Sequence, residues 1–365
     1  MKILYVAYPL LPVNEQSAGG AEQVLWTLER EMHRRGHDTY VAAANGSQIA
    51  GTLIATGAAA ERRDTLAARE IEHRQAIVRA LREHEAANEP FDLIHDMSGS
   101  FWRAAGAIDS SVLATLHLPR HFYPAGAFDD VPPNVRFNSV SRSQAATFAD
   151  LRQMVGVVPN GIALDRFAPR ARAKERDECV ASDSSAGYLL WLGRICEEKG
   201  PHHALDVAHA AGERIIVAGA VYPFLYHQKF HAREVLPRLR RAPNSARFLS
   251  TPAFAEKVDL LRNAKALLLT STVDETSSLV AMEAAACGTP VIALRRGAFP
   301  EVVADGITGF LVDDLKEMGV RIADLPRISP ARCIDHAGKH YPAAAMADGY
   351  AGLYSGSALT SDALK

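Results

Sequence analysis

Residues 274–294 read DETSSLVAMEAAACGTPVIAL, and they indicate the fold class of the chain around them. The polar run at 276–278 consists of residue types that cap the N-termini of helices, and the GTP at 288–290 ends the helix that follows. The apolar run at 291–294 then predicts a buried strand. Loop, helix and strand in this order form one repeat of an α/β domain with a parallel sheet.

The same alternation continues outward from this repeat. In the second half of the chain, strands are predicted at 188–192, 214–218 and 266–270, and helices near 202–211 and 255–264. The first half opens with a strand, a glycine loop, a helix and a strand, at 2–8, 19–20, 21–36 and 39–43. Its further strands are predicted at 91–95, 112–117, 135–140 and 157–158. Both halves are therefore expected to be parallel-sheet α/β domains.

A stretch at 168–187 separates the two halves, because it is rich in charged residues and serine and poor in large apolar side chains. We predict an N-terminal domain at 1–167, a C-terminal domain at 168–340 and a C-terminal helix at 341–365. Ligands of open α/β sheets bind beyond the carboxyl ends of the strands. Two such domains that face each other would form a cleft there.

The composition is that of an ordinary globular protein of 365 residues, with 48% hydrophobic and 22% charged residues. Its formal net charge of −2 gives no overall attraction to nucleic acid. The N-terminus lacks the apolar stretch of an export signal, no window approaches a membrane span, and the four cysteines form no Cys-x-x-Cys pair. We expect a cytoplasmic protein with no nucleic-acid partner and at most peripheral contact with a membrane; the oligomeric state stays open.

Two cations follow the first strand of the second half. Arg194 and Lys199 could hold a phosphate at its carboxyl end, although basic residues are common in exposed loops. The helix that begins after 276–278 offers free N–H groups and the positive end of its dipole, which suit a diphosphate. Glu283 could accept hydrogen bonds from ribose hydroxyls, and Glu275 lies just outside the helix. Alternatively, Glu275 is an exposed capping carboxylate and Glu283 a surface residue.

The spacing Glu275-x7-Glu283, followed by ACGTPVIA, resembles the retaining glycosyltransferases of family 4 (glycosyl transferases group 1), which have the GT-B fold. Other segments agree with that family in the same order, namely GGAE at 19–22, VPNGI at 158–162, GRICEEKG at 193–200 and GAFPEVV at 297–303. The resemblance implies two Rossmann-like domains facing a cleft. The N-terminal one would lie on the acceptor side, the C-terminal one would bind a nucleotide sugar, and the C-terminal helix would return to the N-terminal domain.

The resemblance also implies a role for each matching residue. Arg194 and Lys199 would neutralise the donor diphosphate, Glu275 would hold hydroxyls of the donor sugar, and His117 would lie beside that sugar. These four are the expected catalytic residues. The expected donor-binding residues are Gly19, Gly20, Arg194, Lys199, Thr276, Ser277, Ser278, Leu279 and Glu283.

The family reaction retains the anomeric configuration of the sugar. The chain has no Asp-x-Asp triplet to hold Mg²⁺ or Mn²⁺, so we expect a metal-independent hexosyltransferase that uses a nucleoside-diphosphate sugar as substrate and needs no cofactor. One departure from the family concerns residues 276–278, which read TSS where many members have Gly-Phe-Gly. The close backbone approach that glycines allow is lost there, so the donor pocket is expected to be reshaped.

Other functions stay open at this point. A nicotinamide-dependent oxidoreductase would also have a glycine loop after its first strand, but Gly-x-Gly-x-x-Gly is absent there. A sugar-nucleotide epimerase would convert the donor without an acceptor, and a non-catalytic nucleotide-sugar-binding subunit would keep the fold with a weakened site. The nucleobase, the transferred sugar, the acceptor (a sugar, a lipid or a small metabolite) and the pathway of carbohydrate biosynthesis are open as well.

Overall fold

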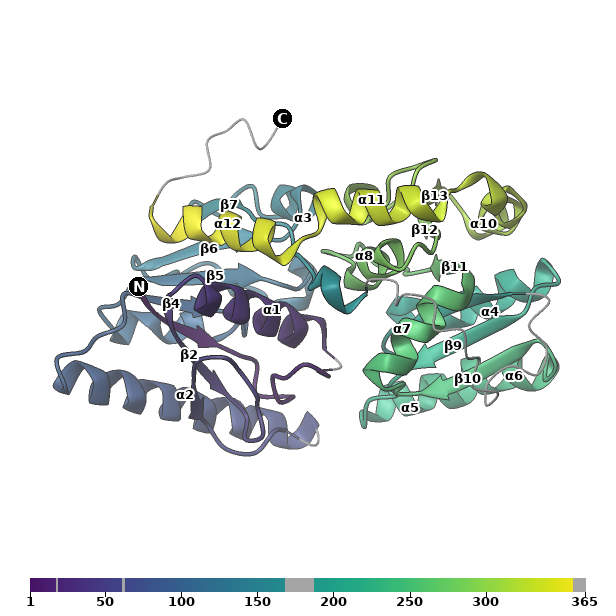
Figure 1. Ribbon diagram of the computed structural model, residues 1–365. Helices are drawn as coiled ribbons and strands as arrows, with labels where there is room; N and C mark the ends of the chain where they lie inside the picture. Colours follow the sequence, from purple (N-terminus) through teal and green to yellow (C-terminus); the bar gives the residue numbers. More distant parts are fainter. Residues whose placement is uncertain (18, 61–62, 168–186, 357–365) are drawn as a thin grey trace. The chain divides into compact units, whose positions relative to one another are not determined.

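The computed structural model describes residues 1–17, 19–60, 63–167 and 187–356 (Figure 1). The chain forms two compact units, one made of Met1–Ile162 with Ala343–Lys365 and the other of Ala163–Pro342. Of the linker predicted at 168–187, all but Gly187 lies outside the described residues. Each unit contains one sheet and the helices that pack on it.

The first unit is built on a seven-stranded sheet of order β3-β2-β1-β4-β5-β6-β7, in which neighbouring strands are parallel. Its strands are β1 (Lys2–Val6), β2 (Asp38–Ala43), β3 (Thr52–Ala55), β4 (Leu93–Asp96), β5 (Val112–Leu116), β6 (Val135–Ser139) and β7 (Met154–Val157). Its α-helices are α1 (Gly20–Arg34), α2 (Arg63–Ala86), α3 (Arg142–Thr147) and α12 (Ala343–Tyr354). The strand order turns back at β1, as in Rossmann-like sheets.

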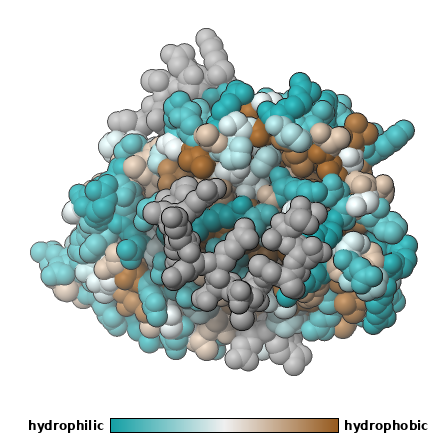
Figure 2. All heavy atoms as spheres, turned by 45° about the vertical axis from the view of Figure 1, so that its right-hand side comes forward, coloured by the Kyte–Doolittle hydropathy of each residue, from teal (hydrophilic) through white to brown (hydrophobic). Residues whose placement is uncertain are grey.

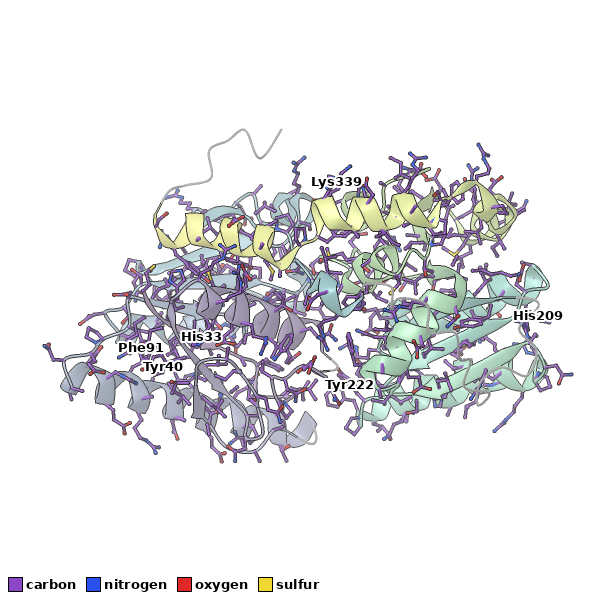
Figure 3. The ribbon with its side chains drawn as sticks, viewed as in Figure 1. His33, Tyr40, Phe91, His209, Tyr222 and Lys339 are labelled. Carbon is purple, nitrogen blue, oxygen red and sulfur yellow. The ribbon has the colours of Figure 1, made fainter. Side chains whose placement is uncertain are left out.

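The core of the first unit lies on the central strands. All five residues of β5 and all four of β4 are buried, whereas the edge strand β3 is only partly covered. Trp102 packs edge-on against Phe137 with ring centroids 5.0 Å apart, and Tyr40 packs likewise against Phe91 at 5.1 Å (Figure 3). Parallel strands that are covered on both faces consist of continuous apolar runs, and such runs are what the sequence pattern detects.

Helix α12, the last helix of the chain, completes the first unit. Its Tyr354 hydroxyl lies 2.7 Å from Nδ1 of His95, and its Tyr350 hydroxyl lies 3.2 Å from Oγ1 of Thr115. All four side chains are buried. Buried polar groups need hydrogen-bond partners, and the two hydroxyls of α12 are such partners for His95 on β4 and Thr115 on β5.

The second unit is built on a six-stranded sheet of order β10-β9-β8-β11-β12-β13, again with parallel neighbours. Its strands are β8 (Tyr188–Leu192), β9 (Ile215–Gly219), β10 (Ala246–Ser250), β11 (Ala264–Leu269), β12 (Val291–Leu294) and β13 (Gly309–Val312). Its α-helices are α4 (Pro201–Ala210), α5 (Leu225–Phe230), α6 (Leu236–Arg241), α7 (Phe254–Asn263), α8 (Leu279–Ala286), α9 (Phe299–Val302), α10 (Leu315–Arg321) and α11 (Pro330–His340). The element order matches the alternation expected from 274–294.

The visible surface in Figure 2 is mostly hydrophilic, and hydrophobic residues occur on it in small separate groups. Large apolar side chains that are exposed include Ile71, Leu118, Phe122 and Leu225. Scattered residues of this kind are usual on folded proteins. Among the described residues, no helix combines the length and the apolar character that crossing a bilayer takes.

Candidate active site

The loop after β8 carries the two cations that the sequence singled out. Arg194 and Lys199 follow β8, and Lys199 ends the short 3-10 turn Glu197–Lys199 that precedes α4. Gly200 comes next with φ 70°, and a Cβ atom there would collide with the carbonyl oxygen of Thr270. Thr270 in turn donates its hydroxyl to the Gly200 carbonyl at 2.7 Å. Because only glycine fits this contact, the residue fixes the loop against the carboxyl end of β11.

Lys199 and Glu275 form the central contact of the site. The Lys199 ammonium donates to both carboxylate oxygens of Glu275, each at 2.7 Å. Ser271 donates its hydroxyl to the same carboxylate at 2.7 Å. The Glu275 side chain is only 12% exposed, so the alternative of an exposed capping carboxylate is wrong. The fold thus brings together two predicted catalytic residues that lie far apart in the sequence.

The backbone of Glu275 is held by the segment after β12. Gly297 has φ 51°, and a Cβ atom at this position would lie 2.6 Å from the backbone nitrogen of Glu275. Ala298 donates its backbone N–H to the Glu275 carbonyl at 2.8 Å. The glycine at the start of GAFPEVV therefore lets this segment pack directly on the loop that carries Glu275.

Arg194 faces a carboxylate that the sequence reasoning did not single out. Its Nη2 lies 3.4 Å from Oε1 of Glu198, and its guanidinium lies 5.6 Å from the ring centroid of Tyr222, a cation–π distance (Figure 3). The main-chain carbonyl of Glu198 accepts from the Ser271 hydroxyl and from the Thr272 N–H, both at 2.8 Å. The loop after β11 thus fixes the backbone of Glu198. In the sequence, only its place in the EEKG motif at 197–200 could have drawn attention to this residue.

A buried thiol and a buried imidazole lie beside Glu198. Cys196, in the loop after β8, and His227, on α5, have no exposed surface. The Cys196 thiol lies 3.5 Å from the carbonyl oxygen of Arg194. Burial raises the pKa of the Cys196 thiol to about 11. The Cys196 sulfur, a carboxylate oxygen of Glu198 and a ring nitrogen of His227 all lie within 4.8 Å of one another. No spacing motif in the sequence joins these three residues.

Hydroxyl groups surround the N-terminus of α8. Ser278 caps the helix, because its hydroxyl accepts from the Ala281 N–H at 3.3 Å. Thr276 is also buried, and Leu279 begins the helix. The Ser277 hydroxyl is buried and makes no hydrogen bond within the part of the chain that the structure describes. This helix end therefore combines a positive dipole with hydroxyl donors.

Glu283, inside α8, forms a buried ion pair. Its carboxylate accepts from the ammonium of Lys257, on α7, at 2.7 Å. The side chains are 5% and 12% exposed, respectively. The alternative that made Glu283 a surface residue is therefore wrong, and Lys257 is a partner that the sequence reasoning missed.

The remaining candidates lie in the first unit. Gly19 precedes α1, which Gly20 begins, and a Cβ atom on Gly19 would collide with the carboxylate of Glu22. Burial raises the pKa of Glu22 to about 7. His117 follows β5 and is partly buried, and burial lowers its pKa to about 4. Gly19 thus makes room for a buried carboxyl group, and His117 is neutral at physiological pH.

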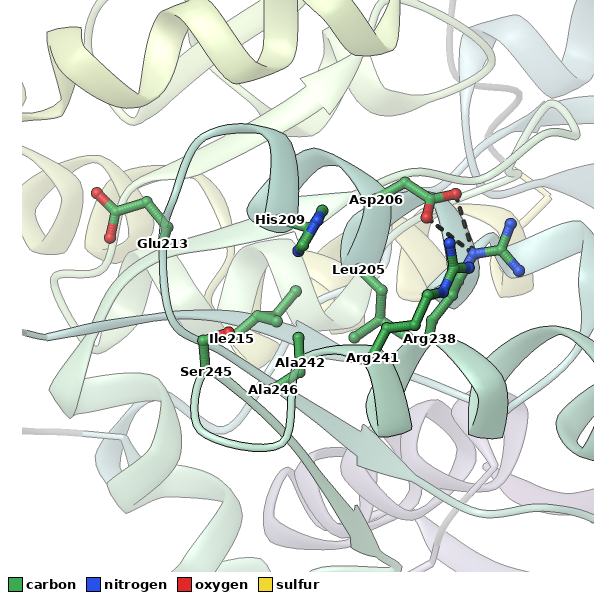
Figure 4. Close-up of a pocket in the computed structure, with 10 residues that line it drawn as sticks. All are labelled: Leu205, Asp206, His209, Glu213, Ile215, Arg238, Arg241, Ala242, Ser245 and Ala246. Carbon is green, nitrogen blue, oxygen red and sulfur yellow. Dashed lines mark hydrogen bonds and ion pairs between the residues drawn. The ribbon is translucent and has the colours of Figure 1, made fainter.

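A small pocket in the second unit is separate from these contacts (Figure 4). It has a volume of about 30 Å³. Within it, Arg238 Nε lies 2.9 Å and 3.0 Å from the two carboxylate oxygens of Asp206. The pocket is lined by Leu205, Asp206, His209, Glu213, Ile215, Arg238, Arg241, Ala242, Ser245 and Ala246. A space of this size holds about two water molecules, too little for a sugar.

Comparison with known proteins finds a family model that matches part of the chain. Residues 174–323 match the family described as glycosyl transferases group 1. This match covers 150 of the 365 residues, and over that part the chain resembles the group 1 glycosyltransferases. Its two Rossmann-like sheets give it the GT-B fold that the resemblance implied.

Similar proteins include two that are named D-inositol 3-phosphate glycosyltransferase. The one from Segniliparus rotundus is 36% identical over 167 residues, which cover 44% of this chain and 36% of the relative. The one from Geodermatophilus obscurus is 30% identical over 279 residues, which cover 65% of this chain and 60% of the relative. The chain thus spans less than two thirds of the length of these relatives.

Solved structures share the fold over almost the whole chain. The crystal structure of Anabaena Alr3699/HepE in complex with UDP-glucose superposes with a TM-score of 0.71 and 17% sequence identity. The match covers 98% of this chain and 100% of the other. At this identity, the likeness shows the fold alone.

Proposed function

We propose that this protein transfers a sugar from a nucleoside-diphosphate donor to an acceptor hydroxyl, with retention of configuration and without a metal ion at the diphosphate. The observation that carries the proposal is the contact of Lys199 with both oxygens of Glu275, each at 2.7 Å, next to the loop that leads into α8. Curated relatives named as glycosyltransferases and a solved relative in complex with UDP-glucose support a nucleotide-sugar donor.

The two cations would bind the donor diphosphate. In the structure, Arg194 faces Glu198 and Lys199 faces Glu275, so the four charges sum to zero. An entering diphosphate would compete with both carboxylates for the cations. As the bond between the anomeric carbon and the phosphate oxygen breaks, negative charge grows on the leaving phosphate. A positioned donor that stabilises such charge contributes about 3 kcal/mol.

The carboxylates would then orient the donor. Once the Lys199 ammonium turns toward phosphate, Glu275 can accept hydrogen bonds from sugar hydroxyls, and Ser271 keeps its carboxylate in place. Glu283 has a second oxygen beyond the one bonded to Lys257, and that oxygen can accept from a ribose hydroxyl. The hydroxyls of 276–278 and the N-terminus of α8 would add donors to the phosphate oxygens, in place of the contacts that glycines make in other members.

The chemical step needs no side-chain base. The acceptor oxygen attacks the anomeric carbon on the face from which the diphosphate leaves. The bond from that carbon to the phosphate oxygen breaks, the bond to the acceptor oxygen forms, and the acceptor proton passes to the leaving phosphate. The products are the glycoside and the nucleoside diphosphate. The roles of His117 beside the sugar, and of Gly19 and Gly20 near phosphate and acceptor, stay predictions from the family resemblance.

The proposal is tested with UDP-, GDP- and ADP-sugars, with and without EDTA, and products followed by mass spectrometry. D-inositol 3-phosphate heads the acceptor panel, because relatives are named for it. We expect release of one nucleoside diphosphate that continues in the presence of EDTA. Lys199→Ala and Glu275→Gln should lower kcat at least about 100-fold. The matched control is Lys339→Ala, which removes an exposed lysine of α11 paired with Asp335 (Figure 3).

Other outcomes assign other functions. A donor that binds without turnover with any acceptor would indicate a nucleotide-sugar-binding subunit. A donor whose sugar is altered but stays attached to the nucleotide would indicate an epimerase. Turnover that EDTA abolishes and Mg²⁺ or Mn²⁺ restores would refute the metal-free diphosphate site.

A further inference from the structure

We propose that Cys196, Glu198 and His227 form a binding site for a zinc-class transition-metal ion. One thiol sulfur, one carboxylate oxygen and one imidazole nitrogen from these residues lie within 4.8 Å of one another. In the part of the chain that the structure describes, no other group of three or more His, Cys, Asp and Glu side chains converges in this way. The site lies wholly within the second unit, on the loop after β8 and on α5.

The spacing is close to that of a tetrahedral zinc site. Zinc bonds of about 2.0–2.3 Å to sulfur, nitrogen and oxygen place neighbouring ligand atoms about 3.5 Å apart. The longest separation allowed here is 4.8 Å, so closing the site shortens any ligand pair by at most about 1.3 Å (4.8 − 3.5). Side-chain rotation can supply such a change without moving the strands.

The surroundings hold the ligands in place. Cys196 and His227 are fully buried, and the Glu198 side chain is 17% exposed. The Glu198 backbone is bonded to Ser271 and Thr272 at the end of β11. The rings of Tyr222 and Tyr226 lie 5.9 Å and 4.0 Å from that of His227. The Arg194 guanidinium, 3.4 Å from the Glu198 carboxylate, would have to give up that contact when a metal binds. Three protein ligands leave a fourth position for water or another small ligand.

The ligand set selects the class of metal. Thiolate and imidazole favour zinc and related borderline ions over Mg²⁺ and Mn²⁺, which prefer oxygen ligands. The site therefore differs in chemistry from a hard-metal site at a diphosphate. Metal binding would also join α5 to the loop that holds Arg194 and Lys199. An effect of the metal on donor binding rests on the proposed function, whereas the metal site itself is independent of it.

Cobalt serves as the probe, because a Co²⁺–thiolate bond gives charge-transfer absorption in the near ultraviolet, and tetrahedral Co²⁺ gives intense visible bands. The full-length protein is stripped with EDTA, dialysed and titrated with Co²⁺, then with Zn²⁺. We expect one Co²⁺ per chain with a thiolate band, displaced by one equivalent of Zn²⁺. Cys196→Ser should abolish the thiolate band, and His227→Ala and Glu198→Gln should each weaken Zn²⁺ binding more than about 100-fold.

The matched controls are Cys333→Ser, which removes another buried free thiol, and His231→Ala, which removes a neighbouring histidine just past α5. Both should bind Co²⁺ as the wild type does. Circular dichroism of each metal-free variant shows whether it folds, and the wild-type titration does not depend on any variant folding.

Absence of a thiolate band in the folded wild type, or the same band in folded Cys196→Ser, would overturn the proposal. The proposed transferase function fails on different measurements, because it is read from donor turnover in EDTA. A protein that binds cobalt through Cys196 but turns over no donor would keep the metal site and lose the transferase.

Discussion

Removing the ammonium of Lys257 should destabilise the second unit by about 3 kcal/mol. The Lys257 ammonium lies 2.7 Å from the Glu283 carboxylate, and the two side chains are 12% and 5% exposed. Deleting one partner of a buried pair leaves the other charge without compensation, at a cost of about 3–5 kcal/mol. We take the lower end because Lys257 keeps some exposure. Lys257→Met is the change of choice, since it retains most of the side-chain stem and removes the ammonium, which also lies 5.0 Å from the ring centroid of Phe254.

The partner variants turn this value into a coupling energy. Glu283→Gln leaves the buried ammonium of Lys257 without a carboxylate and should cost a similar amount. The double variant buries neither charge, and a neutral replacement of a buried pair costs little or is neutral. We therefore expect the double variant to be at least about 2 kcal/mol more stable than the two single effects would give if they added.

Urea unfolding measures these values for the second unit alone. The chain has three tryptophans, and Trp191 on β8 is the one in that unit. With Trp26 and Trp102 changed to Phe, the fluorescence of Trp191 reports the unfolding of the second unit. Lys339→Met, at the exposed pair with Asp335, should change stability by less than about 1 kcal/mol. Additive single effects in the double variant would refute the reasoning, because they would mean that the two charges do not interact.

Three other predictions concern other groups. Burial raises the pKa of Glu22 from 4.5 to about 7, so ionising it costs stability progressively as pH rises through that interval, and the loss stays constant above it. Glu22→Gln should therefore gain up to about 3 kcal/mol on the wild type between these pH values, as measured by urea midpoints. Tyr354→Phe removes the hydroxyl 2.7 Å from buried His95 and should lower the free energy of unfolding of the first unit by about 1–2 kcal/mol. The exposed-site control, Tyr226→Phe, should lower stability by less than about 0.5 kcal/mol. One equivalent of Zn²⁺ should change the affinity for UDP measured by calorimetry in the wild type and not in His227→Ala; equal effects in both would mean that zinc acts on the nucleotide alone.

The strands that the sequence predicted best are those buried on both faces. β8 and β12 match the predictions at 188–192 and 291–294, because continuous apolar runs bounded by glycine and proline have few other solutions. The edge strands β3 and β10 were not predicted. They are partly exposed along their length, so they carry no continuous apolar run. β13 was missed as well, because it begins with glycine and its apolar run is only three residues long.

Motifs located the candidate site, but they did not give its charge pairs. The loop with Lys199 and the segment with Glu275 could be placed at carboxyl ends of strands, since parallel sheets gather those ends at one edge. That the two side chains bond to each other depends on rotamers and on Ser271. The Lys257 partner of Glu283 lies on another helix, and no local pattern relates a position on one helix to a position on the next. The charge pattern of residues 226–241 likewise gives no sign that this segment contains the fully buried His227.

The place of α12 in the first unit sets an order on biosynthesis. The second unit is one continuous stretch, Ala163–Pro342, and can form while the chain is still being made. The first unit must wait for Ala343, which is 181 residues after Ile162 (343 − 162). At about 5–20 residues per second, the ribosome needs roughly 10–35 s for that distance. During this delay His95 and Thr115 lack the tyrosine hydroxyls that they contact in the finished protein. The half of the protein that is synthesised first is therefore completed last, and a premature stop before α12 would spare the second unit while leaving the first exposed to proteases and chaperones.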